Sequence, residues 1–377
     1  MKKIVFIFFL TIFTCLAGVN LAKSQDLKNE ANFKRHSYIP GYGIKKMKNP
    51  NIFQGNRKRK KYFEGWYFKM VSADGFSILS VIPGISLSHN GEEQHAFIQI
   101  IDGKTAKTFY YTFPIEEFIF SKKRFVVRIG DNYFSEDRII LNIQNDSTSI
   151  KGEIHMSDQV YLSQNKKKKK GIMGWYRFVP FMQCYHGVVS LTHNLNGSLI
   201  KDNKTYNFDN GLGYIEKDWG KSMPSDWIWM QSNNFNSENT SFMLSVANIP
   251  WMGSSFTGFL GFFLHDSTLQ RFGTYTDAKL HLETSNSDTI RITITDKTHT
   301  YLIETYRNKS GVLKAPVKGS MDRRISESID AKLLLKVMDK NANVIFSDST
   351  SIAGLETVGN INMLSNNDKR KKSNDAD

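Results

Sequence analysis

The sequence predicts an all-β protein made of two β-barrel domains that are related by an internal duplication. Short runs rich in β-branched and aromatic residues recur along the chain, dipeptides typical of hairpin turns separate them, and one strand pair occurs twice. At 377 residues the chain is long enough for two domains of ordinary size. Regularly spaced short strands indicate a barrel or a sandwich, and closing a barrel removes the edge strands that the chain would otherwise expose.

The predicted strands follow one another with short connections. In the first half we predict strands at Tyr62–Val71, Gly75–Ile82, His95–Ile101, Lys107–Phe113, Arg124–Ile129, Arg138–Ile143 and Thr148–Met156. In the second half we predict them at Trp227–Ser232, Thr240–Asn248, Gly258–Leu264, Ala278–Glu283, Thr289–Thr295, Thr300–Tyr306 and Ala331–Met338. Strong hairpin signals lie between such runs at Asp74-Gly75, Asn90-Gly91, Asp102-Gly103 and Asn196-Gly197. No helical periodicity is sustained, so the class is all-β.

A Trp-bearing strand, a turn and a Leu-Ser-Val strand that ends in proline occur twice. The first copy begins near Trp66 and the second near Trp229. We therefore predict that residues 62–205 form the first barrel domain and residues 206–362 the second.

The N-terminus has the order of segments found in secretory signal peptides. Two lysines precede an apolar run, Ile4–Ala17, and small or polar residues follow it. We predict that residues 1–24 direct export, which gives a periplasmic, secreted or membrane-associated protein; an uncleaved membrane anchor is the alternative. Residues 25–61 are then a basic extension and residues 363–377 a basic, disordered tail.

The formal charge of +14 is concentrated in three basic runs, Arg57–Lys61, Lys166–Lys170 and Lys369–Lys372. Blocks of like charge are usually solvated loops or tails. Aromatic residues do not alternate with these lysines and arginines, and the known nucleic-acid-binding motifs are not found, so nucleic acid is not an expected partner. An anionic membrane surface is a better match for an exported protein.

The sequence predicts chemistry without a cofactor or a bound metal. The two cysteines exclude a disulfide framework and a Cys-based zinc site. The histidines form no recognised ligand spacing, and the chain has no Walker loop, no dinucleotide-binding glycine motif and no Gly-x-Ser-x-Gly elbow. Catalysis would then depend on acids and a cavity alone.

Distinctive motifs lie between and around the two repeats. They are YFEGWYFK at Tyr62–Lys69, GWYRFVPFMQCYHGVVS at Gly174–Ser190, GLGYIEKDWGKSMPSDWIWMQSNNF at Gly211–Phe235, KAPVKGSMDRRISES at Lys314–Ser328 and AGLETVG at Ala353–Gly359. From Tyr62 to about Gly359 the sequence resembles the tocopherol cyclase family. That family is similar to carotenoid hydratase-like proteins built from two lipocalin-like (calycin-type) barrels. One departure is Met223, where the family usually has Phe.

The resemblance implies a cofactor-free ring closure in a hydrophobic prenylquinol or another isoprenoid small molecule. A proton adds to the first prenyl double bond of a prenylated, phytyl-type hydroquinone, and the phenolic oxygen closes a chromanol ring. Such chemistry needs a buried, neutral carboxylic acid, aromatic faces beside the cation and an apolar cavity. The alternatives are a lipocalin-like carrier that only binds such a ligand, and a proton-initiated hydratase.

Three acids are candidate proton donors. Glu64 lies in an aromatic strand on the same face as Trp66, where it is either catalytic or the partner of a buried cation. Glu216 and Asp218 flank Lys217 and share a face, so they form either an acid pair with separated pKa values or a structural salt-bridge cluster. We expect Glu327 and Glu356, which lie in family-like segments, to pair with Arg323 or Arg324.

A histidine and several flat side chains complete the predicted site. His186 is either a base for the phenol or a satisfied core histidine. The predicted substrate-binding residues are Trp66, Tyr185, Trp219, Trp227, Trp229 and Gln231. Cys184 is expected to be a small buried hydrophobe.

Overall fold

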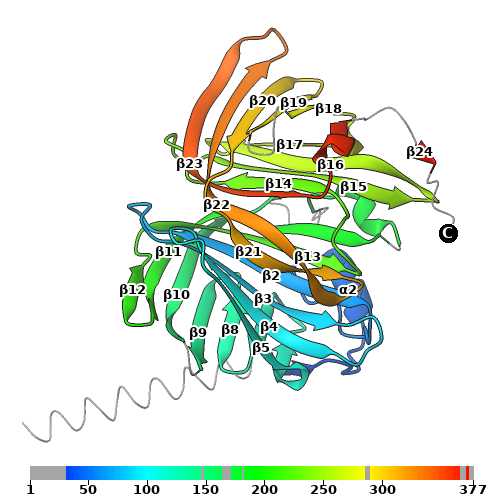
Figure 1. The fold of residues 1–377 in the computed structure, drawn as a ribbon, viewed down its shortest axis with the longest axis vertical. Coiled ribbons are helices and arrows are strands. Elements are labelled where there is room, and N and C mark those ends of the chain that lie inside the picture. Colours follow the sequence, from blue (N-terminus) through cyan, green and yellow to red (C-terminus); the bar gives the residue numbers. More distant parts are fainter. Residues whose placement is uncertain are drawn as a thin grey trace, which may run out of the picture.

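The protein consists of two large antiparallel β-sheets, one above the other in Figure 1. The structure, a computed structural model, describes residues 31–145, 148–163, 171–180, 182–284, 289–365 and 371–372. The predicted signal peptide, the whole Lys166–Lys170 run, the first two residues of the Lys369–Lys372 run and the end of the tail lie outside these residues. The all-β class predicted from the sequence is confirmed.

Sheet 1 has thirteen strands in the order β1-β6-β7-β8-β9-β10-β11-β13-β2-β3-β4-β5, with β12 paired to β11. Their bounds are β1 Phe33–Lys34, β2 Tyr62–Val71, β3 Ile78–Leu87, β4 Gln94–Asp102, β5 Thr108–Pro114, β6 Phe118–Phe120, β7 Val126–Ile129, β8 Asn132–Ser135, β9 Arg138–Gln144, β10 Ser149–Val160, β11 Cys184–Lys201, β12 Lys204–Asn207 and β13 Gly211–Gly220.

Sheet 2 has eleven strands in the order β17-β16-β15-β14-β23-β22-β20-β19-β18, with β21 paired to β22 and β24 to β16. Their bounds are β14 Trp227–Ser232, β15 Ser241–Trp251, β16 Ser254–His265, β17 Thr268–Gly273, β18 Lys279–Thr284, β19 Thr289–Thr295, β20 His299–Tyr306, β21 Gly311–Val317, β22 Ser320–Asp339, β23 Val344–Val358 and β24 Lys371–Lys372. The helices are short: α2 Tyr42–Lys48, η1 Ile115–Glu117, η2 Gly174–Phe178, η3 Thr274–Thr276 and η4 Ile361–Ser365. No helix among the described residues combines the length and apolar character needed to cross a bilayer.

The two strand pairs of the predicted duplication occupy corresponding places. Strand β2 pairs with β3 in sheet 1, and β14 pairs with β15 in sheet 2. However, the strand order of each sheet ends in two different edge strands, and within the described residues neither sheet closes into a barrel. Two curved, open sheets are therefore observed where two closed barrels were expected.

The boundary between the sheets lies after β13. This strand pairs with β11 and β2 of sheet 1, so sheet 1 continues to Gly220 rather than ending near residue 205. Part of the predicted N-terminal extension also belongs to sheet 1, because β1 pairs with β6 and Phe53 is buried in its core. The run Arg57–Lys61 is exposed, as expected for a solvated loop.

One predicted turn is wrong. Asn196-Gly197 lies inside β11, where Gly197 pairs with Ile154 of β10. Gly197 has φ +125°, and a Cβ there would lie 2.2 Å from the backbone oxygen of Glu153. The glycine therefore permits a close approach of two strands and does not mark a hairpin.

Three large apolar clusters, and a small fourth one at Ala31, Val126 and Tyr133, hold the described part of the molecule together. One fills the inner face of sheet 1 with aromatic residues such as Trp66, Phe68 and Phe125, and a second fills the inner face of sheet 2. The third lies between the sheets and includes Tyr67, Trp227 and Trp229. Because the two inner faces are packed with side chains, the space for a ligand must be sought between the sheets.

The hairpin β21–β22 ties the sheets together by crossing from sheet 2 onto sheet 1 (Figure 1). Gln99 of β4 accepts a hydrogen bond from the Lys314 amide at 2.8 Å, and Thr108 donates to the Val312 carbonyl at 2.9 Å. Ser86 donates to the Gly319 carbonyl at 2.8 Å. The first half of β22 therefore forms a wall of the region between the sheets.

Candidate functional site

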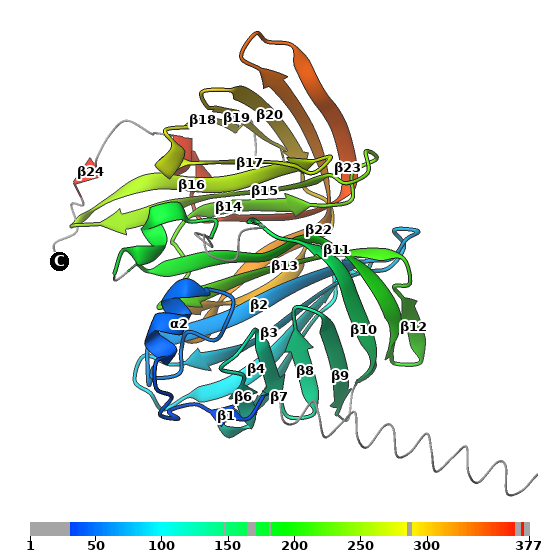
Figure 2. The same ribbon diagram turned by 180° about the vertical axis from the view of Figure 1, so that it is seen from behind.

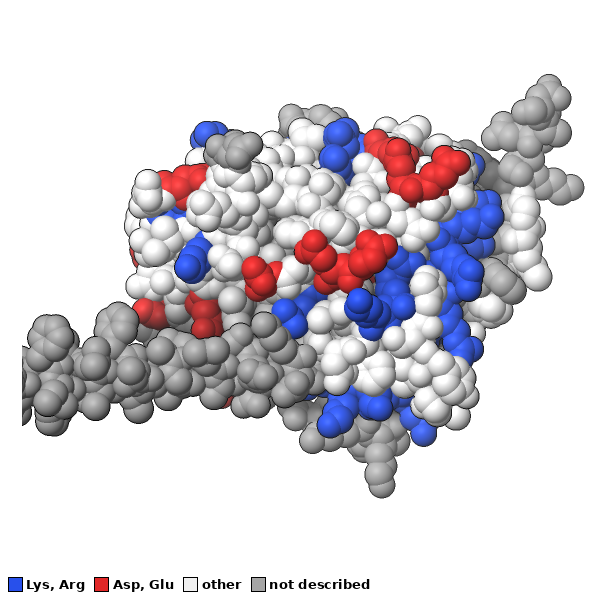
Figure 3. Space-filling model, turned by 90° about the horizontal axis from the view of Figure 1, so that it is seen from below, with Lys and Arg blue, Asp and Glu red and all other residues white. Residues whose placement is uncertain are grey.

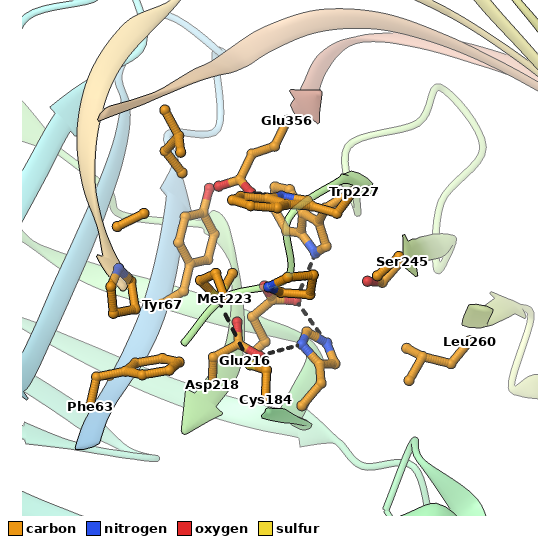
Figure 4. Close-up of a pocket in the computed structure, with 18 of the residues that line it drawn as sticks. Phe63, Tyr67, Cys184, Glu216, Asp218, Met223, Trp227, Ser245, Leu260 and Glu356 are labelled. Atoms are coloured by element: carbon orange, nitrogen blue, oxygen red, sulfur yellow. Dashed lines mark hydrogen bonds and ion pairs between the residues drawn. The ribbon is translucent and has the colours of Figure 1, made fainter. Parts of the chain in front are cut away.

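A cavity of about 200 Å³ lies between the two sheets. Its walls come from β2, β4, β11 and β13 of sheet 1, from β14, β15, β16 and β23 of sheet 2, and from the crossing hairpin β21–β22. The lining is mainly apolar, with a small group of titratable side chains gathered at one place (Figure 4). This composition is typical of ligand-binding sites.

Strand alternation brings a histidine and two carboxylates together on sheet 1. His186 of β11 lies directly opposite Asp218 of β13, and Glu216 is two residues before Asp218 on the same face. The Nδ1 atom of His186 lies 2.9 Å from Asp218 Oδ1, and its Nε2 atom lies 3.5 Å from Glu216 Oε2. The prediction that Glu216 and Asp218 share a face opposite Lys217 is confirmed.

The environment of this group separates its pKa values. Burial alone would lower the pKa of His186, but the carboxylates of Asp218 and Glu216 outweigh it and raise the pKa to about 9. Burial raises the pKa of Glu216 to about 7, with the His186 charge acting against it and the Asp218 charge adding to it. Near neutral pH the site therefore holds an imidazolium and a carboxyl group that is partly protonated.

Glu216 is held firmly in place by two donors. The Tyr214 hydroxyl donates to Glu216 Oε2 at 2.7 Å, and the indole N–H of Trp229 donates to the same oxygen at 3.1 Å. Both donors stabilise the ionised form. When Glu216 gives up a proton, its carboxylate is already hydrogen-bonded, which lowers the cost of the transfer.

Sheet 2 and the crossing hairpin supply two further buried acids. Glu327 of β22 and Glu356 of β23 are directly opposite each other across the two strands. The Tyr67 hydroxyl donates to Glu327 Oε1 at 2.7 Å, and the indole N–H of Trp227 donates to Glu356 Oε2 at 2.6 Å. In Figure 4, Glu356 and Trp227 lie together across the cavity from Asp218 and Cys184.

These two acids also favour their neutral forms. Burial raises the pKa of Glu356 to about 7. Burial and then the charge of Glu356 raise the pKa of Glu327 well above its usual range. Like charges this close cannot both ionise cheaply in a dry environment, so the pair holds at least one proton near neutral pH.

Aromatic side chains form much of the remaining wall. They include Trp227 and Trp229 of β14, and also Phe63, Phe97, Tyr176, Phe256, Phe259 and Tyr275. Gly354 leaves room for one of them, because a Cβ there would lie 2.6 Å from the ring of Trp229. The faces of such rings attract a cation in a site from which water is excluded.

The structure brings five of the predicted residues into the cavity wall. They are His186, Glu216, Asp218, Trp227 and Trp229. Met223, the departure from the family pattern, also lines it, and Cys184 Sγ lies 3.8 Å from the Met223 sulfur. Cys184 is a half-buried thiol whose pKa is raised by desolvation, so it is not an activated nucleophile.

Glu64 and Trp66 lie elsewhere, which corrects their assignment to the site. They face the core of sheet 1, where Trp66 stacks on Phe125 with ring centroids 5.1 Å apart. Glu64 forms an ion pair with Lys217 at 2.6 Å and accepts the Tyr62 hydroxyl at 2.6 Å and the amides of residues 54 and 55. Of the two roles considered for Glu64, the geometry shows the partner of a buried cation.

Tyr185, Trp219 and Gln231 are also outside the cavity wall, contrary to their assignment as substrate-binding residues. Tyr185 stacks on Trp219 with centroids 5.5 Å apart, and its hydroxyl donates to the Val179 carbonyl. Gln231 is buried, with its side-chain oxygen 3.4 Å from the Lys69 ammonium. These contacts are structural.

Sequence reasoning did not place Glu356 in the cavity wall, nor Glu327 opposite it on β22, which is not itself a lining residue. It expected them to pair with Arg323 or Arg324, but in the described part of the chain neither acid forms an ion pair with an arginine. Arg323 donates instead to the carbonyls of Pro224 and Ser225. The sequence pattern that could have identified them is an acid within a run of alternating apolar and polar residues. This pattern occurs at Glu327 in RRISES and at Glu356 in AGLETVG.

His186, Glu216 and Asp218 are also the group whose geometry comes nearest to a metal site among the described residues. Their ligand atoms lie within 4.8 Å of one another. The Nδ1 atom of His186 is engaged with Asp218, and Glu216 Oε2 accepts two hydrogen bonds. These partners account for the arrangement as a hydrogen-bonded group.

Comparison with known proteins agrees with this description. CghA, a solved structure, superposes with a TM-score of 0.50 at 8% identity, covering 88% of this chain and 96% of that one. At such identity the likeness concerns the fold alone.

Sequence relatives are found among plant enzymes. The probable chloroplastic tocopherol cyclase of Oryza sativa subsp. japonica is 31% identical over 81 residues, and the chloroplastic tocopherol cyclase of Zea mays is 28% identical over 82 residues. These alignments cover 21% and 22% of this chain and 17% of each relative. The tocopherol cyclase-like family profile matches residues 137–359, more than half of the chain. The chain therefore belongs to the tocopherol cyclase-like family.

Proposed function

We propose that this protein closes a ring in a prenylated hydroquinone by protonating the first double bond of its prenyl chain. The observation that carries the proposal is Glu216, a buried carboxyl group with a pKa of about 7 in an aromatic cavity beside His186 and Asp218. Family membership supports a cyclase of the isomerase kind that acts on a hydrophobic prenyl lipid.

The reaction needs no oxidant and no net proton. Neutral Glu216 gives its proton to the less substituted carbon of the double bond, and the electron pair of the double bond forms the new C–H bond. The other carbon of the double bond becomes a tertiary cation. The phenolic oxygen then bonds to the cationic carbon. Its proton returns to the Glu216 carboxylate, which regenerates the donor and leaves a chromanol isomeric with the substrate.

Each step has a matching feature in the cavity wall. Alkenes are weak bases, so the donor must be a neutral acid in a dry place, and burial of Glu216 meets that demand. The rings of Trp227 and Trp229 lie beside Glu216 and supply the electron-rich faces that stabilise the cation. The His186 imidazolium compensates the charge of the carboxylate that forms. Folding the chain in the cavity removes the entropy cost of closing the ring.

The experiment compares Glu216→Gln with Glu238→Gln, which neutralises an exposed glutamate outside the cavity. We expect Glu216→Gln to lower kcat for chromanol formation by about 10²–10⁴-fold, the usual contribution of a general acid. Glu238→Gln should leave kcat unchanged. Binding of the quinol, measured by quenching of tryptophan fluorescence, should persist in both variants because Gln keeps the shape of the site.

The product distinguishes the alternatives. A tertiary alcohol that carries one additional water would identify a hydratase. Tight binding of several prenylquinols without any product would identify a carrier. Full activity of Glu216→Gln would exclude Glu216 as the donor and make Glu356, the acid on the opposite wall, the group to test next.

A further inference from the structure

We propose that one side of the molecule docks on an anionic lipid bilayer. This docking side is defined by exposed apolar side chains from three segments: Ile44 and Met47 of α2, Trp175 and Phe178 of η2, and Trp251 and Met252 at the β15–β16 turn. The proposal concerns where the protein works, and it does not depend on the chemistry proposed for the cavity.

These side chains are unusually exposed for their size. The exposed fractions are 92% for Met252, 63% for Ile44, 61% for Met47, 58% for Phe178, 55% for Trp175 and 40% for Trp251. Single exposed apolar residues are common, but a gathering of large ones on one side indicates a binding surface. Tryptophan in particular suits the boundary between water and lipid, because its ring is apolar and its N–H is polar.

Contacts between the three segments make them one surface. The Arg177 side chain of η2 donates to the Met47 carbonyl of α2. Tyr176 of η2 stacks on Trp175 with centroids 4.0 Å apart and faces Phe256 of β16 at 6.4 Å. Figure 2 shows α2 and the β15–β16 turn on the same side of the molecule.

Positive charge surrounds the apolar side chains, which selects an anionic partner. Lys45 and Lys48 of α2 are exposed next to Ile44 and Met47. Burial lowers the pKa of Lys46, and the charge of Glu64 opposes this effect. The charges of Lys58 and Arg57 lower the pKa further, so the basic run Arg57–Lys61 lies close to α2. In Figure 3 many Lys and Arg side chains lie on the right, below a smaller group of Asp and Glu side chains.

The chemistry of this surface fits a bilayer better than a nucleic acid. Ile44, Met47 and Met252, the most exposed of the six, are aliphatic side chains that contribute nothing to base stacking. All six side chains can enter the acyl region of a bilayer while the lysines meet its anionic headgroups. The same segments also line the cavity, through Tyr176 and Phe256. A lipid-dissolved molecule could therefore pass from the bilayer to the cavity without crossing water.

The test uses the full chain and vesicles whose acyl chains carry bromine, which quenches tryptophan only within the bilayer. Of the six tryptophans, Trp175 and Trp251 are exposed and belong to the docking side. We expect quenching with vesicles of three parts phosphatidylcholine to one part phosphatidylglycerol. The triple variant Ile44→Ser, Met47→Ser, Met252→Ser keeps both reporters and should need at least tenfold more lipid for half-maximal quenching.

A matched control replaces exposed apolar residues on another part of the surface. Val344→Ser with Ile345→Ser, at the start of β23, alters residues that are 51% and 47% exposed and should leave the quenching curve unchanged. Replacing phosphatidylglycerol by phosphatidylcholine, or changing Lys45 and Lys48 to Gln, should weaken binding several-fold. Circular dichroism verifies that each variant is folded.

Three results would overturn the proposal. Sedimentation with vesicles but no quenching would show that another part of the chain, such as the N-terminal apolar run, does the binding. Equal quenching of the triple variant and the parent would exclude these side chains. Equal binding to neutral and anionic vesicles would exclude the role of charge. None of these results depends on turnover, so they leave the cyclase proposal to its own test.

Discussion

At the scale of single residues, two buried glutamates show how the surroundings decide the role of a carboxyl group. Glu64 meets the Lys217 ammonium, two backbone amides and a tyrosine hydroxyl, which makes it the structural partner of a buried cation. Glu216, on the opposite side of sheet 1, meets a histidine, a second acid, a tyrosine and an indole. Breaking the Glu64–Lys217 pair would leave an uncompensated buried charge, at a cost of about 3–5 kcal/mol.

The protonation state of Glu216 makes the proposed reaction depend on pH. Because burial raises the pKa of Glu216 to about 7, the neutral donor predominates below pH 7 and declines about tenfold per pH unit well above it. We expect kcat to be flat between pH 5.5 and 6.5 on this account and to fall above pH 7. A pH–rate profile of ring closure measures this directly.

Removing one hydrogen bond to Glu216 tests whether Glu216 is the group whose titration limits the rate. The Tyr214 hydroxyl donates to Glu216 and lowers its pKa, and Tyr214 is outside the cavity wall. Tyr214→Phe should therefore move the falling part of the profile to higher pH without removing any group that touches the substrate. An unchanged profile in this variant would show that another acid limits the rate.

At the scale of elements, strands dominated by aromatic or β-branched residues were easy to predict. Strands β2, β14 and β19 begin and end where the sequence placed them. Strand β13 was missed because three charged residues in a row, Glu216, Lys217 and Asp218, interrupt its apolar pattern, with Glu216 toward the cavity and Lys217 toward the core. Strand β11 was missed because Asn196-Gly197 reads as a turn, although Gly197 serves the close packing of β10 and β11.

The candidate site was predictable on one sheet only. Alternation along β13 and β14 placed Glu216, Asp218, Trp227 and Trp229 together, because residues two apart share a face. Glu356 belongs to a strand far along the chain that pairs with β14, and no local pattern specifies that pairing. The position of the cavity between two sheets is a property of their packing.

A glycine in β13 offers a test of how precisely this element must be placed. A Cβ at Gly213 would lie 2.2 Å from His193 Nε2, and His193 is buried with its pKa lowered by burial to about 3. Gly213→Ala should therefore push β13, which carries Glu216 and Asp218, away from β11. We expect a loss of stability of about 1–3 kcal/mol, typical of overpacking, and a fall in kcat.

The double variant Gly213→Ala, His193→Ala provides the control. Removing the imidazole gives the new methyl group room, so stability and kcat should recover together toward those of His193→Ala alone. Chemical denaturation and steady-state kinetics measure the two quantities. Additive losses in the double variant would show that the clash with His193 is not the cause.

At the scale of the whole molecule, we expect the cavity and the proposed docking side to form one route for the substrate. The cavity, at about 200 Å³, is smaller than the 300–1,000 Å³ of usual ligand pockets. A quinol ring beside Glu216 and the first part of its chain would therefore fill it, and a longer chain must continue outward. Strand β15 marks the direction, because Ser245, Ala247 and Ile249 line the cavity in sequence toward exposed Trp251.

Blocking this route near its end should alter the preference for chain length. Ile249 pairs with Phe256 across β15 and β16, two residue pairs away from Trp251. The larger side chain of Ile249→Trp should narrow the passage there and leave Glu216, Trp227 and Trp229 unchanged. We expect kcat/KM to fall at least tenfold for a hydroquinone with a twenty-carbon chain and to stay within about threefold for a five-carbon chain. The short substrate is the internal control, because it reports any damage to the reacting end of the cavity. An equal loss for both substrates would place Ile249 next to the reacting groups. No loss for either substrate would show that the chain leaves by another wall. Only a selective loss for the long chain supports an exit toward the docking side.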